Sequence, residues 1–440
     1  MTGSAGAAAA DRAVASEPRT SIRSVVGGSV GNLVEWFDWY VYSAFSLYFA
    51  PVFFPGTDQT AQFLATSGVF WVGFLMRPVG GWVLGRVADR HGRRAALAWS
   101  VGLMGGGALL IALTPGYAAI GIAAPLLLIL ARIIQGMSLG GEYGAAATYL
   151  TEVSHPDHRG FWSSFQYVTL YGGQLLALGL LIGMQTSGLD EAALSGWGWR
   201  VAFVAGAALA LIVFWLRRGI AESPDFVAES GTEKRKGGVA ELWANHRRHV
   251  LIAFGLAIGS NVVFYTYTTY MQKYLVVSAG FDKPTASLIC GAAILAAILV
   301  QPPIAALSDR IGRKPLQYVF GIGSVLGTVP LMTAIGATRD PMTAFLLILI
   351  ALAILSCATA TNAVVKSELF PVHVRALGVG LPYAVSQSLF GGSAETLALS
   401  FKRAGVESGF FWYVSFMAAI ALFAAWMMPE TRPRAKRTPA

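Results

Sequence analysis

Gly85-Arg86-Val87-Ala88-Asp89-Arg90-His91-Gly92-Arg93-Arg94 closes one long apolar run, and a similar charged stretch, Ala305-Ala306-Leu307-Ser308-Asp309-Arg310-Ile311-Gly312-Arg313-Lys314, closes another 220 residues later. The two stretches share an Asp-Arg pair followed by glycine and further basic residues. Because the apolar runs around them carry little charge, a dense charged turn repeated at half the chain length predicts two homologous membrane halves.

The composition of the chain is that of a membrane protein. Its 440 residues are 55% hydrophobic and only 12% charged, with a mean hydropathy of +0.58. A helix needs about 20 apolar residues to cross the hydrocarbon core of a bilayer. We expect an all-α protein with twelve such spans in two pseudo-symmetric six-helix bundles. The expected spans cover residues 23–54, 61–85, 95–114, 120–152, 160–185, 199–217, 250–277, 284–307, 315–336, 342–368, 376–400 and 408–428.

The charged residues between the spans predict the topology. The net charge of +9 comes from short basic clusters between apolar runs, which indicates positive-inside orientation rather than binding to nucleic acid. We expect a multi-pass protein of the cell (inner or plasma) membrane with both termini cytoplasmic. Its predicted parts are a disordered tail at 1–22, bundles at 23–217 and 250–428, a central cytoplasmic loop at 218–249 and a tail at 429–440.

A second repeat supports the duplication. An acid ends a span and an arginine follows seven residues later in both Glu152 to Arg159 and Glu368 to Arg375, an offset of 216 residues. Charge-assisted bonds within such motifs suit a gate that opens and closes one side of the protein. Fixing topology alone is the simpler alternative. The gating residues that we expect are Gly85, Asp89, Arg90, Gly92, Arg93, Glu152, Arg159, Asp309, Arg310, Arg313, Glu368 and Arg375.

Ionisable residues inside the spans are few, and each is a functional candidate because burying a charge in a bilayer is costly. Glu35 and Asp38 lie three residues apart on one helical face. Two nearby carboxylates resist simultaneous ionisation, so one of them can carry a proton, and Glu142 is a further candidate for proton coupling. Pairing with a neighbouring cation is the alternative role for these acids.

The cations inside the spans favour an anionic solute. Arg77 and Arg132 can bind a carboxylate through two parallel hydrogen bonds, and Lys273 and Lys366 supply cations in the second half. In the alternative interpretation, Glu35, Asp38 and Glu142 saturate the two arginines. The polar side chains expected to complete the substrate site are Tyr42, Gln166, Tyr167 and Tyr270.

The charged repeat between the second and third spans, with its partner between the eighth and ninth, resembles the hallmark loop of the major facilitator superfamily. Ala305 stands where the first copy has glycine. Three longer stretches resemble the metabolite:proton symporter family within it. These are Gly31-Asn-Leu-Val-Glu-Trp-Phe-Asp38, Phe74-Leu-Met-Arg-Pro-Val-Gly-Gly81 and Gln135-Gly-Met-Ser-Leu-Gly-Gly-Glu-Tyr143.

Further stretches in both halves resemble the bacterial α-ketoglutarate permeases of that family, among them Thr268-Thr-Tyr-Met-Gln-Lys-Tyr-Leu275 and Phe390-Gly-Gly-Ser-Ala-Glu395. The resemblance implies alternating access and uptake of α-ketoglutarate or a related dicarboxylate together with protons. It implies no cofactor, with the proton as coupling ion, and we expect a monomer.

Other functions remain open at the level of sequence. Within the same family the solute can instead be citrate, shikimate, proline or betaine. A substrate sensor that does not transport is a different class, but such a protein would lack the coupling acids. An enzyme is disfavoured, because no nucleophile elbow, phosphate loop or metal-binding helix is present.

Overall fold

In a computed structural model of the protein, the structure describes residues 22–91, 93–140, 151, 154–218 and 238–431. All secondary structure in these ranges is helical, as the sequence predicts. The helices of the first half are α2 (Ile22–Phe53), α3 (Gln59–Leu75), α4 (Arg77–His91), α5 (Arg93–Leu113), α6 (Tyr117–Ile120), α7 (Ala123–Ser138), η1 (Pro156–His158), α9 (Arg159–Ser163), α10 (Phe165–Thr186), α11 (Glu191–Ala193), η2 (Leu194–Gly198) and α12 (Trp199–Arg218).

The second half is built in the same way. Its helices are α14 (Val239–Tyr265), η3 (Thr266–Tyr270), α15 (Met271–Val277), α16 (Lys283–Ile311), α17 (Lys314–Ala337), α18 (Pro341–Thr359), α19 (Asn362–Leu369), α20 (Val372–Ser386), η4 (Gln387–Gly391), α21 (Ala394–Arg403) and α22 (Glu407–Met427). Part of the expected central loop is helical, since α14 begins at Val239 and kinks at His246. The predicted domain boundaries themselves stay predictions.

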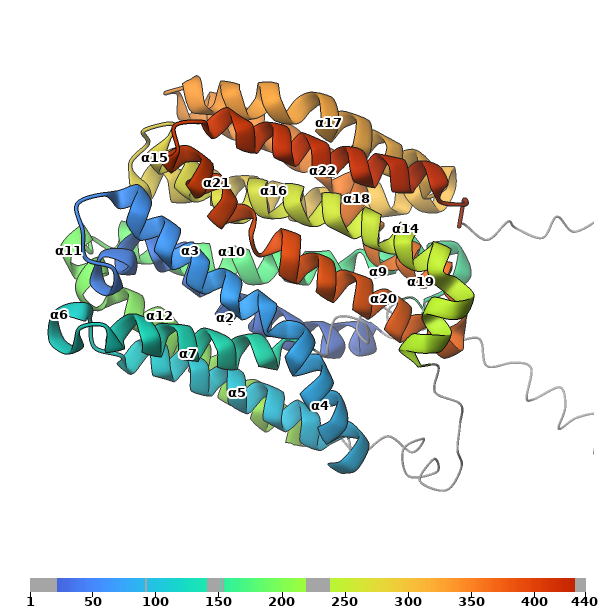
Figure 1. The fold of residues 1–440 in the computed structure, drawn as a ribbon, viewed down its shortest axis with the longest axis horizontal. Helices are drawn as coiled ribbons and strands as arrows, with labels where there is room; N and C mark the ends of the chain where they lie inside the picture. The colour runs from blue at the N-terminus through green and yellow to red at the C-terminus, as the bar shows by residue number, and fades with distance from the viewer. Residues whose placement is uncertain (1–21, 92, 141–150, 152–153, 219–237, 432–440) are drawn as a thin grey trace, which may run out of the picture.

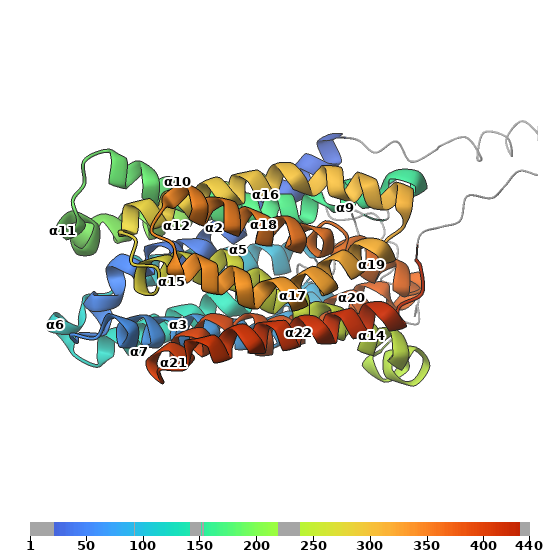
Figure 2. The same cartoon turned by 90° about the horizontal axis from the view of Figure 1, so that it is seen from above.

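Among the described residues, eight helices are long and apolar enough to cross a bilayer, and two shorter apolar helices cover Ala98–Leu113 and Ala123–Ser138. The two remaining predicted spans correspond to α2 and to the interrupted helix α20–η4–α21. Figures 1 and 2 show the long helices running side by side, with α6 and α11 at one end of the molecule and α9 and α19 at the other.

The two halves form two layers that meet along four helices. In Figure 1, α5, α7 and α12 lie in one layer and α17, α18 and α22 in the other. Contacts between the layers are made chiefly by α10 on α16 and by α21 on α3. Helix α4 also contacts α20, and α3 contacts η4, so a site formed by side chains of α3, α4 and η4 lies at the boundary along which the halves would move against each other.

Glycines allow the helices of the first half to approach closely around α7. A side chain at Gly136 would collide with the backbone of Gly73, and one at Gly140 with the backbone of Arg77. Glycine is thus required at these crossings because only a missing Cβ lets the two backbones touch. This contact places Arg77 beside Arg132, which lies on α7.

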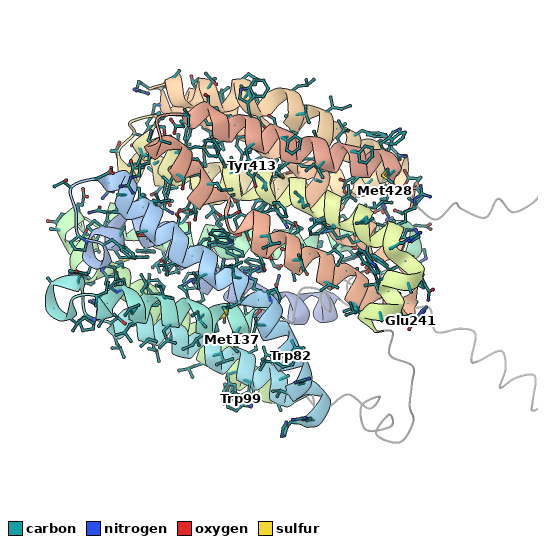
Figure 3. All side chains as sticks on the ribbon, viewed as in Figure 1. Trp82, Trp99, Met137, Glu241, Tyr413 and Met428 are labelled. Atoms are coloured by element: carbon teal, nitrogen blue, oxygen red, sulfur yellow. The ribbon has the colours of Figure 1, made fainter. Side chains whose placement is uncertain are left out.

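The outer surface is apolar and rich in aromatic residues. Figure 3 shows Trp82 and Trp99 on the outer side of α4 and α5, and their side chains are 59% and 61% exposed. Trp215, Trp412 and Trp426 are also exposed. Large exposed apolar side chains over most long helices fit a surface that faces lipid, with tryptophans at its interfacial borders.

Candidate functional site

Arg77 and Arg132 are buried on helices α4 and α7 of the first half, in a cage of aromatic rings. The guanidinium carbon of Arg132 is 3.9 Å from the ring centre of Trp39 and 4.5 Å from that of Tyr42. The guanidinium carbon of Arg77 is 4.4 Å from the ring centres of Trp39 and Phe74. Trp39 therefore separates the two cations, and the negative ring faces compensate part of their desolvation.

Both guanidinium groups have hydrogen-bond donors to spare. The Nε and Nη2 atoms of Arg77 and of Arg132 have no hydrogen-bond partner among the residues that the structure describes. An unsatisfied N–H of a buried charged group is costly, so native structures usually pair it with a protein group, water or a ligand. The geometry suits a carboxylate, which can accept two parallel bonds from one guanidinium.

An amide links Arg132 to one of the predicted coupling acids. Gln135 accepts a hydrogen bond of 2.8 Å from Nη1 of Arg132 and donates one of 2.7 Å to Asp38. The other carboxylate oxygen of Asp38, Oδ1, has no partner in the described chain. Gly206 on α12 makes room for it, because a Cβ there would lie 2.5 Å from that oxygen. The charge on Asp38 is thus coupled to Arg132 through a single side chain.

Glu35 lies one turn before Asp38 and is equally buried. It interacts electrostatically with Arg77 rather than with Arg132. Each predicted acid of the first span therefore acts on a different arginine. This division was not evident from the sequence, where the two acids share one helical face. The third acid, Glu142, lies outside the described residues.

Arg77 also binds a residue of the second half. Its Nη1 donates a 2.5 Å hydrogen bond to Oε1 of Gln387, which in turn donates to the hydroxyl of Tyr265 at 2.8 Å. Gln387 begins η4, the π-helical turn that interrupts the eleventh predicted span. Sequence reasoning missed Gln387 and Tyr265, although a lone glutamine within an apolar run was an available signal.

The predicted polar side chains are all buried but fall into different places. Tyr42 contacts the Arg132 cage and donates its hydroxyl to the backbone of Thr66 at 3.0 Å. Tyr167 accepts a 2.6 Å bond from Asn362 of the second half. The Nε2 atom of the adjacent Gln166 has no partner in the described chain. Tyr270 packs on the rings of its neighbours instead of facing the arginines.

The two lysines of the second half are also buried. Lys273 forms an ion pair of 2.7 Å with Glu395, a residue that sequence reasoning did not assign to the site. Lys366 lies 4.9 Å from the ring centre of Tyr383 and lines a small cavity with Asn362 and Ser260. The predicted cations thus fall into separate groups: the two arginines in the aromatic cage, Lys273 beside Glu395, and Lys366 beside Tyr383.

The second charged repeat joins the two halves at the end of the molecule where α9 and α19 lie (Figure 2). The carboxylate of Asp309 accepts hydrogen bonds of 2.8 and 2.9 Å from the backbone N–H groups of Gly160 and Phe161, at the start of α9. Arg313 donates to the same carboxylate at 2.7 Å and lies 3.5 Å from Glu368. Asp309 therefore ties the second half to the first.

The motifs that end at Arg159 and Arg375 take part in the same network. Arg159 interacts electrostatically with Glu368, which also accepts a 2.7 Å bond from Thr431. Arg375 donates to the backbone carbonyl of Phe370.

Of the other predicted gating residues, Gly85 and Arg90 lie in α4 and Arg310 in α16. Gly92, Glu152 and the side chains of Asp89 and Arg93 lie outside the described part of the chain. The first copy of the predicted gate therefore stays a prediction.

A second contact between the halves lies at the opposite end of the molecule. Lys283 at the start of α16 forms an ion pair of 2.5 Å with Glu191 of α11. Nearby, Gln185 donates to the hydroxyl of Tyr48 at 2.7 Å. The aromatic cage and the Lys273–Glu395 pair thus belong to a molecule whose halves touch at both ends.

A sequence profile described as "Major Facilitator Superfamily" matches residues 29–394. The chain belongs to this superfamily. It is 49% identical over 413 residues to the alpha-ketoglutarate permease of Escherichia coli (strain K12), covering 94% of this chain and 95% of the relative. It is 32% identical to the proline/betaine transporter of Salmonella typhimurium (strain LT2), over 95% of this chain and 86% of the relative.

A solved structure has the same fold. The crystal structure of a D-xylose-proton symporter superposes with a TM-score of 0.76 at 22% identity, covering 93% of this chain and 98% of that one. The predicted family and its twelve-helix fold are confirmed. Like its relatives, the protein is a multi-pass membrane transporter. It is not an enzyme.

Proposed function

We propose that this transporter imports α-ketoglutarate or a related dicarboxylate across the inner membrane together with protons. Both termini face the cytoplasm in this proposal, and the protein works as a monomer with the proton as coupling ion and no cofactor. The relative with 49% identity over nearly the whole chain is an alpha-ketoglutarate permease, which supports the substrate class.

The observation that carries the proposal is the pair of buried guanidinium groups with unpaired donors. Arg77 and Arg132 each offer Nε and Nη2 inside a cage that excludes water. A substrate carboxylate would satisfy the spare donors of one arginine, and a dicarboxylate brings a second group for another cation. A neutral solute could offer only neutral acceptors to these donors, and hydrogen bonds to such acceptors are roughly half as strong as those to a carboxylate.

The coupling proton acts through Asp38. When Asp38 is ionised, it holds Gln135, and Gln135 occupies one donor of Arg132. A proton on Asp38 removes the charge that holds the amide, so Gln135 can turn away and Arg132 gains a free donor for the substrate. Proton binding and substrate binding then favour each other, which is the thermodynamic requirement for symport.

The runner-up keeps the mechanism and changes the solute. The proline/betaine transporter shares 32% identity over 95% of this chain, so a zwitterion is one alternative solute. Citrate and shikimate remain within the same family. A zwitterion would use only one of the two arginines for its carboxylate and would need an anion for its ammonium group.

Purified protein in liposomes tests the proposal. An inward proton gradient should drive accumulation of labelled α-ketoglutarate, and a protonophore should abolish it. Arg77→Gln should lower kcat/KM about 100-fold, because loss of a charge-assisted pair of hydrogen bonds costs about 3 kcal/mol. In counterflow, unlabelled dicarboxylates should compete, whereas proline and betaine should not.

Arg86→Gln is the matched control. Arg86 lies on the same helix and also sits over a tryptophan ring, at 3.8 Å from that of Trp82, but on the exposed surface. Its replacement should leave uptake unchanged. Wild-type protein that accumulates proline or betaine but no dicarboxylate would refute the proposed solute. Normal uptake by Arg77→Gln would remove Arg77 from the site.

A further inference from the structure

The ion pair between Lys273 and Glu395 is buried and joins two helical segments of the second half, α15 and α21. The side chains are only 2% and 3% exposed, and the Nζ–Oε1 distance is 2.7 Å. The second carboxylate oxygen, Oε2 of Glu395, is buried without a hydrogen-bond partner in the described residues. An ammonium group offers three donors, and within the described part of the chain the carboxylate of Glu395 is the ion-pair partner of Lys273.

Such a pair is a poor structural element. Removing two charges from water costs several kcal/mol per ion, and the attraction between them offsets this only when the remaining donors and acceptors are satisfied. Here one carboxylate oxygen, Oε2 of Glu395, has no partner among the described residues. Replacing a buried ion pair of this kind by apolar residues is often neutral or stabilising, so its presence here points to a use other than stability.

The position of the pair connects it with the arginine cage. Lys273 lies on α15, directly after the π-helical turn η3, and Glu395 follows the π-helical turn η4. Gln387, the residue that binds Arg77, lies on the same η4. Turns of this type interrupt regular helices and often occur at functional sites. One interrupted helix thus carries the partner of Arg77 and the partner of Lys273.

Tyr42 provides a second connection. Its ring lies 4.5 Å from the guanidinium carbon of Arg132, and it also interacts electrostatically with Glu395. Tyr42 therefore interacts with both the arginine cage of the first half and the ion pair of the second. A substrate with two carboxylates therefore has cations available on both sides of the interface between the halves.

We infer that Glu395 occupies the place of a substrate carboxylate on Lys273, and that a dicarboxylate displaces it there during transport. The inference rests on the proposed function and extends it with a second carboxylate subsite. In the substrate-free protein the internal carboxylate keeps the buried ammonium neutralised. In the loaded protein the substrate takes its place, and the interrupted helix is free to move.

Displacement leaves Glu395 without its cation, so it is favoured when Glu395 takes up a proton. Among the described residues, the ionisable side chains that interact with Glu395 are Lys273 from α15, Tyr270 from η3 and Tyr42 from α2. Helix α14 also packs on α21, and its Tyr265 pairs with Gln387. Helix α3, which packs against α21, has no ionisable side chain, and Glu407 of α22 interacts with Tyr270 and pairs with Lys402. Lys273 is thus the cation that faces this carboxylate directly.

Three variants test the inference in liposomes after dicarboxylate uptake by the wild type has been established. Glu395→Gln removes the internal competitor, so the KM for α-ketoglutarate should fall several-fold. Lys273→Gln removes the subsite, so KM should rise roughly tenfold or more. The double variant should resemble Lys273→Gln, because the subsite is missing in both.

A purely structural pair predicts the opposite pattern. Two neutral amides leave no unpaired buried charge, so the double variant would then recover wild-type KM while each single variant is impaired. Recovery in the double variant, or an unchanged or raised KM in Glu395→Gln, would overturn the inference. If the lysine variants do not fold, the KM of Glu395→Gln by itself still tests the inference.

The Lys402–Glu407 pair supplies the control. It joins α21 to α22 at 3.4 Å and is partly exposed. Lys402→Gln with Glu407→Gln should leave KM unchanged. Absence of any dicarboxylate uptake by the wild type would refute the proposed function itself, whereas recovered uptake in the Lys273/Glu395 double variant would refute only the second subsite.

Discussion

Replacing Asp309 by Asn should open the contact between the halves at the end of the molecule that carries the charged repeats. The carboxylate accepts the backbone N–H groups of Gly160 and Phe161 at 2.8 and 2.9 Å, and Arg313 donates to it at 2.7 Å. An asparagine keeps one acceptor oxygen but turns an N–H toward the second donor. It also removes the negative charge at the N-terminal end of α9.

The magnitude follows from the bonds that cross between the halves. Hydrogen bonds to a charged group contribute about 1.5–3 kcal/mol each. Of the two backbone bonds to Asp309, asparagine can keep at most one, and its acceptor oxygen is neutral. A loss of about 1.5–3 kcal/mol shifts the equilibrium toward the separated state by roughly ten- to a hundredfold. The neighbouring Gly160 cannot compensate by moving closer, because it already lies against Asp309 and Arg313 without a Cβ between them.

Cysteine accessibility measures this shift. Cys290 and Cys357 are buried and can be replaced, and Ser163→Cys then provides a single reporter. Ser163 lies at the end of α9, is buried, and its hydroxyl has no partner in the described residues. Its reaction rate with a membrane-impermeant maleimide in inside-out vesicles reports the population of the open state. That rate should rise roughly ten- to a hundredfold in Asp309→Asn.

Asp340→Asn is the matched control. Asp340 also caps a helix, accepting from the backbone N–H of Thr343 at 2.8 Å, but both residues belong to the second half. Its replacement should not change the labelling rate. A rate for Asp309→Asn equal to that of the parent protein, in vesicles where the protein is folded, would show that Asp309 does not hold the halves together.

Two further predictions concern assembly and stability. Gly136→Ala should prevent α7 from packing on α3 at Gly73 and so reduce the yield of folded protein. Gly102→Ala should not reduce it, because nothing lies within 4 Å of the added methyl group. Equal yields of the two variants in size-exclusion chromatography would contradict this. Asp282→Ala should lower the free energy of unfolding by about 1 kcal/mol, since Asp282 caps α16 through the backbone N–H of Thr285. That bond holds the pKa of Asp282 below its ordinary value, so its contribution is complete above the unfolded-state pKa and is lost only as the pH falls through the lower folded-state value. The difference in Tm between wild type and variant should therefore be constant between about pH 5 and 8, and a difference that vanishes within that range would contradict the capping role.

Local patterns were enough to predict the helices and the family. Apolar runs of about 20 residues indicate membrane spans because the bilayer core fixes their length. The repeated Asp-Arg-Gly motif and the stretch around Glu35 and Asp38 indicated the duplication and the symporter resemblance. These signals lie within short segments, so no knowledge of tertiary contacts is needed to read them.

Which charge meets which partner was not predictable in the same way. Arg77 binds Gln387, 310 residues away, because a helix of the first half packs on one of the second. Lys273 binds Glu395 because α15 and α21, which lie far apart in the sequence of the second half, come together in the fold. A lone glutamine or glutamate in an apolar run shows that a polar group is buried. It does not show which cation it meets, since that depends on helix rotation and on the angle at which helices cross.

The sequence by itself determined that this protein spans a membrane in two related halves, and that its few intramembrane charges are Glu35, Asp38, Arg77, Arg132 and their counterparts in the second half. Only the tertiary structure decided that Trp39 separates the two arginines, that Gln135 connects Arg132 to Asp38, and that Glu395 covers Lys273. The physical reason is the range of the forces involved. Hydrophobicity over a span is a sum along the chain, whereas hydrogen bonds and ion pairs act over about 3–4 Å and exist only after the helices have packed.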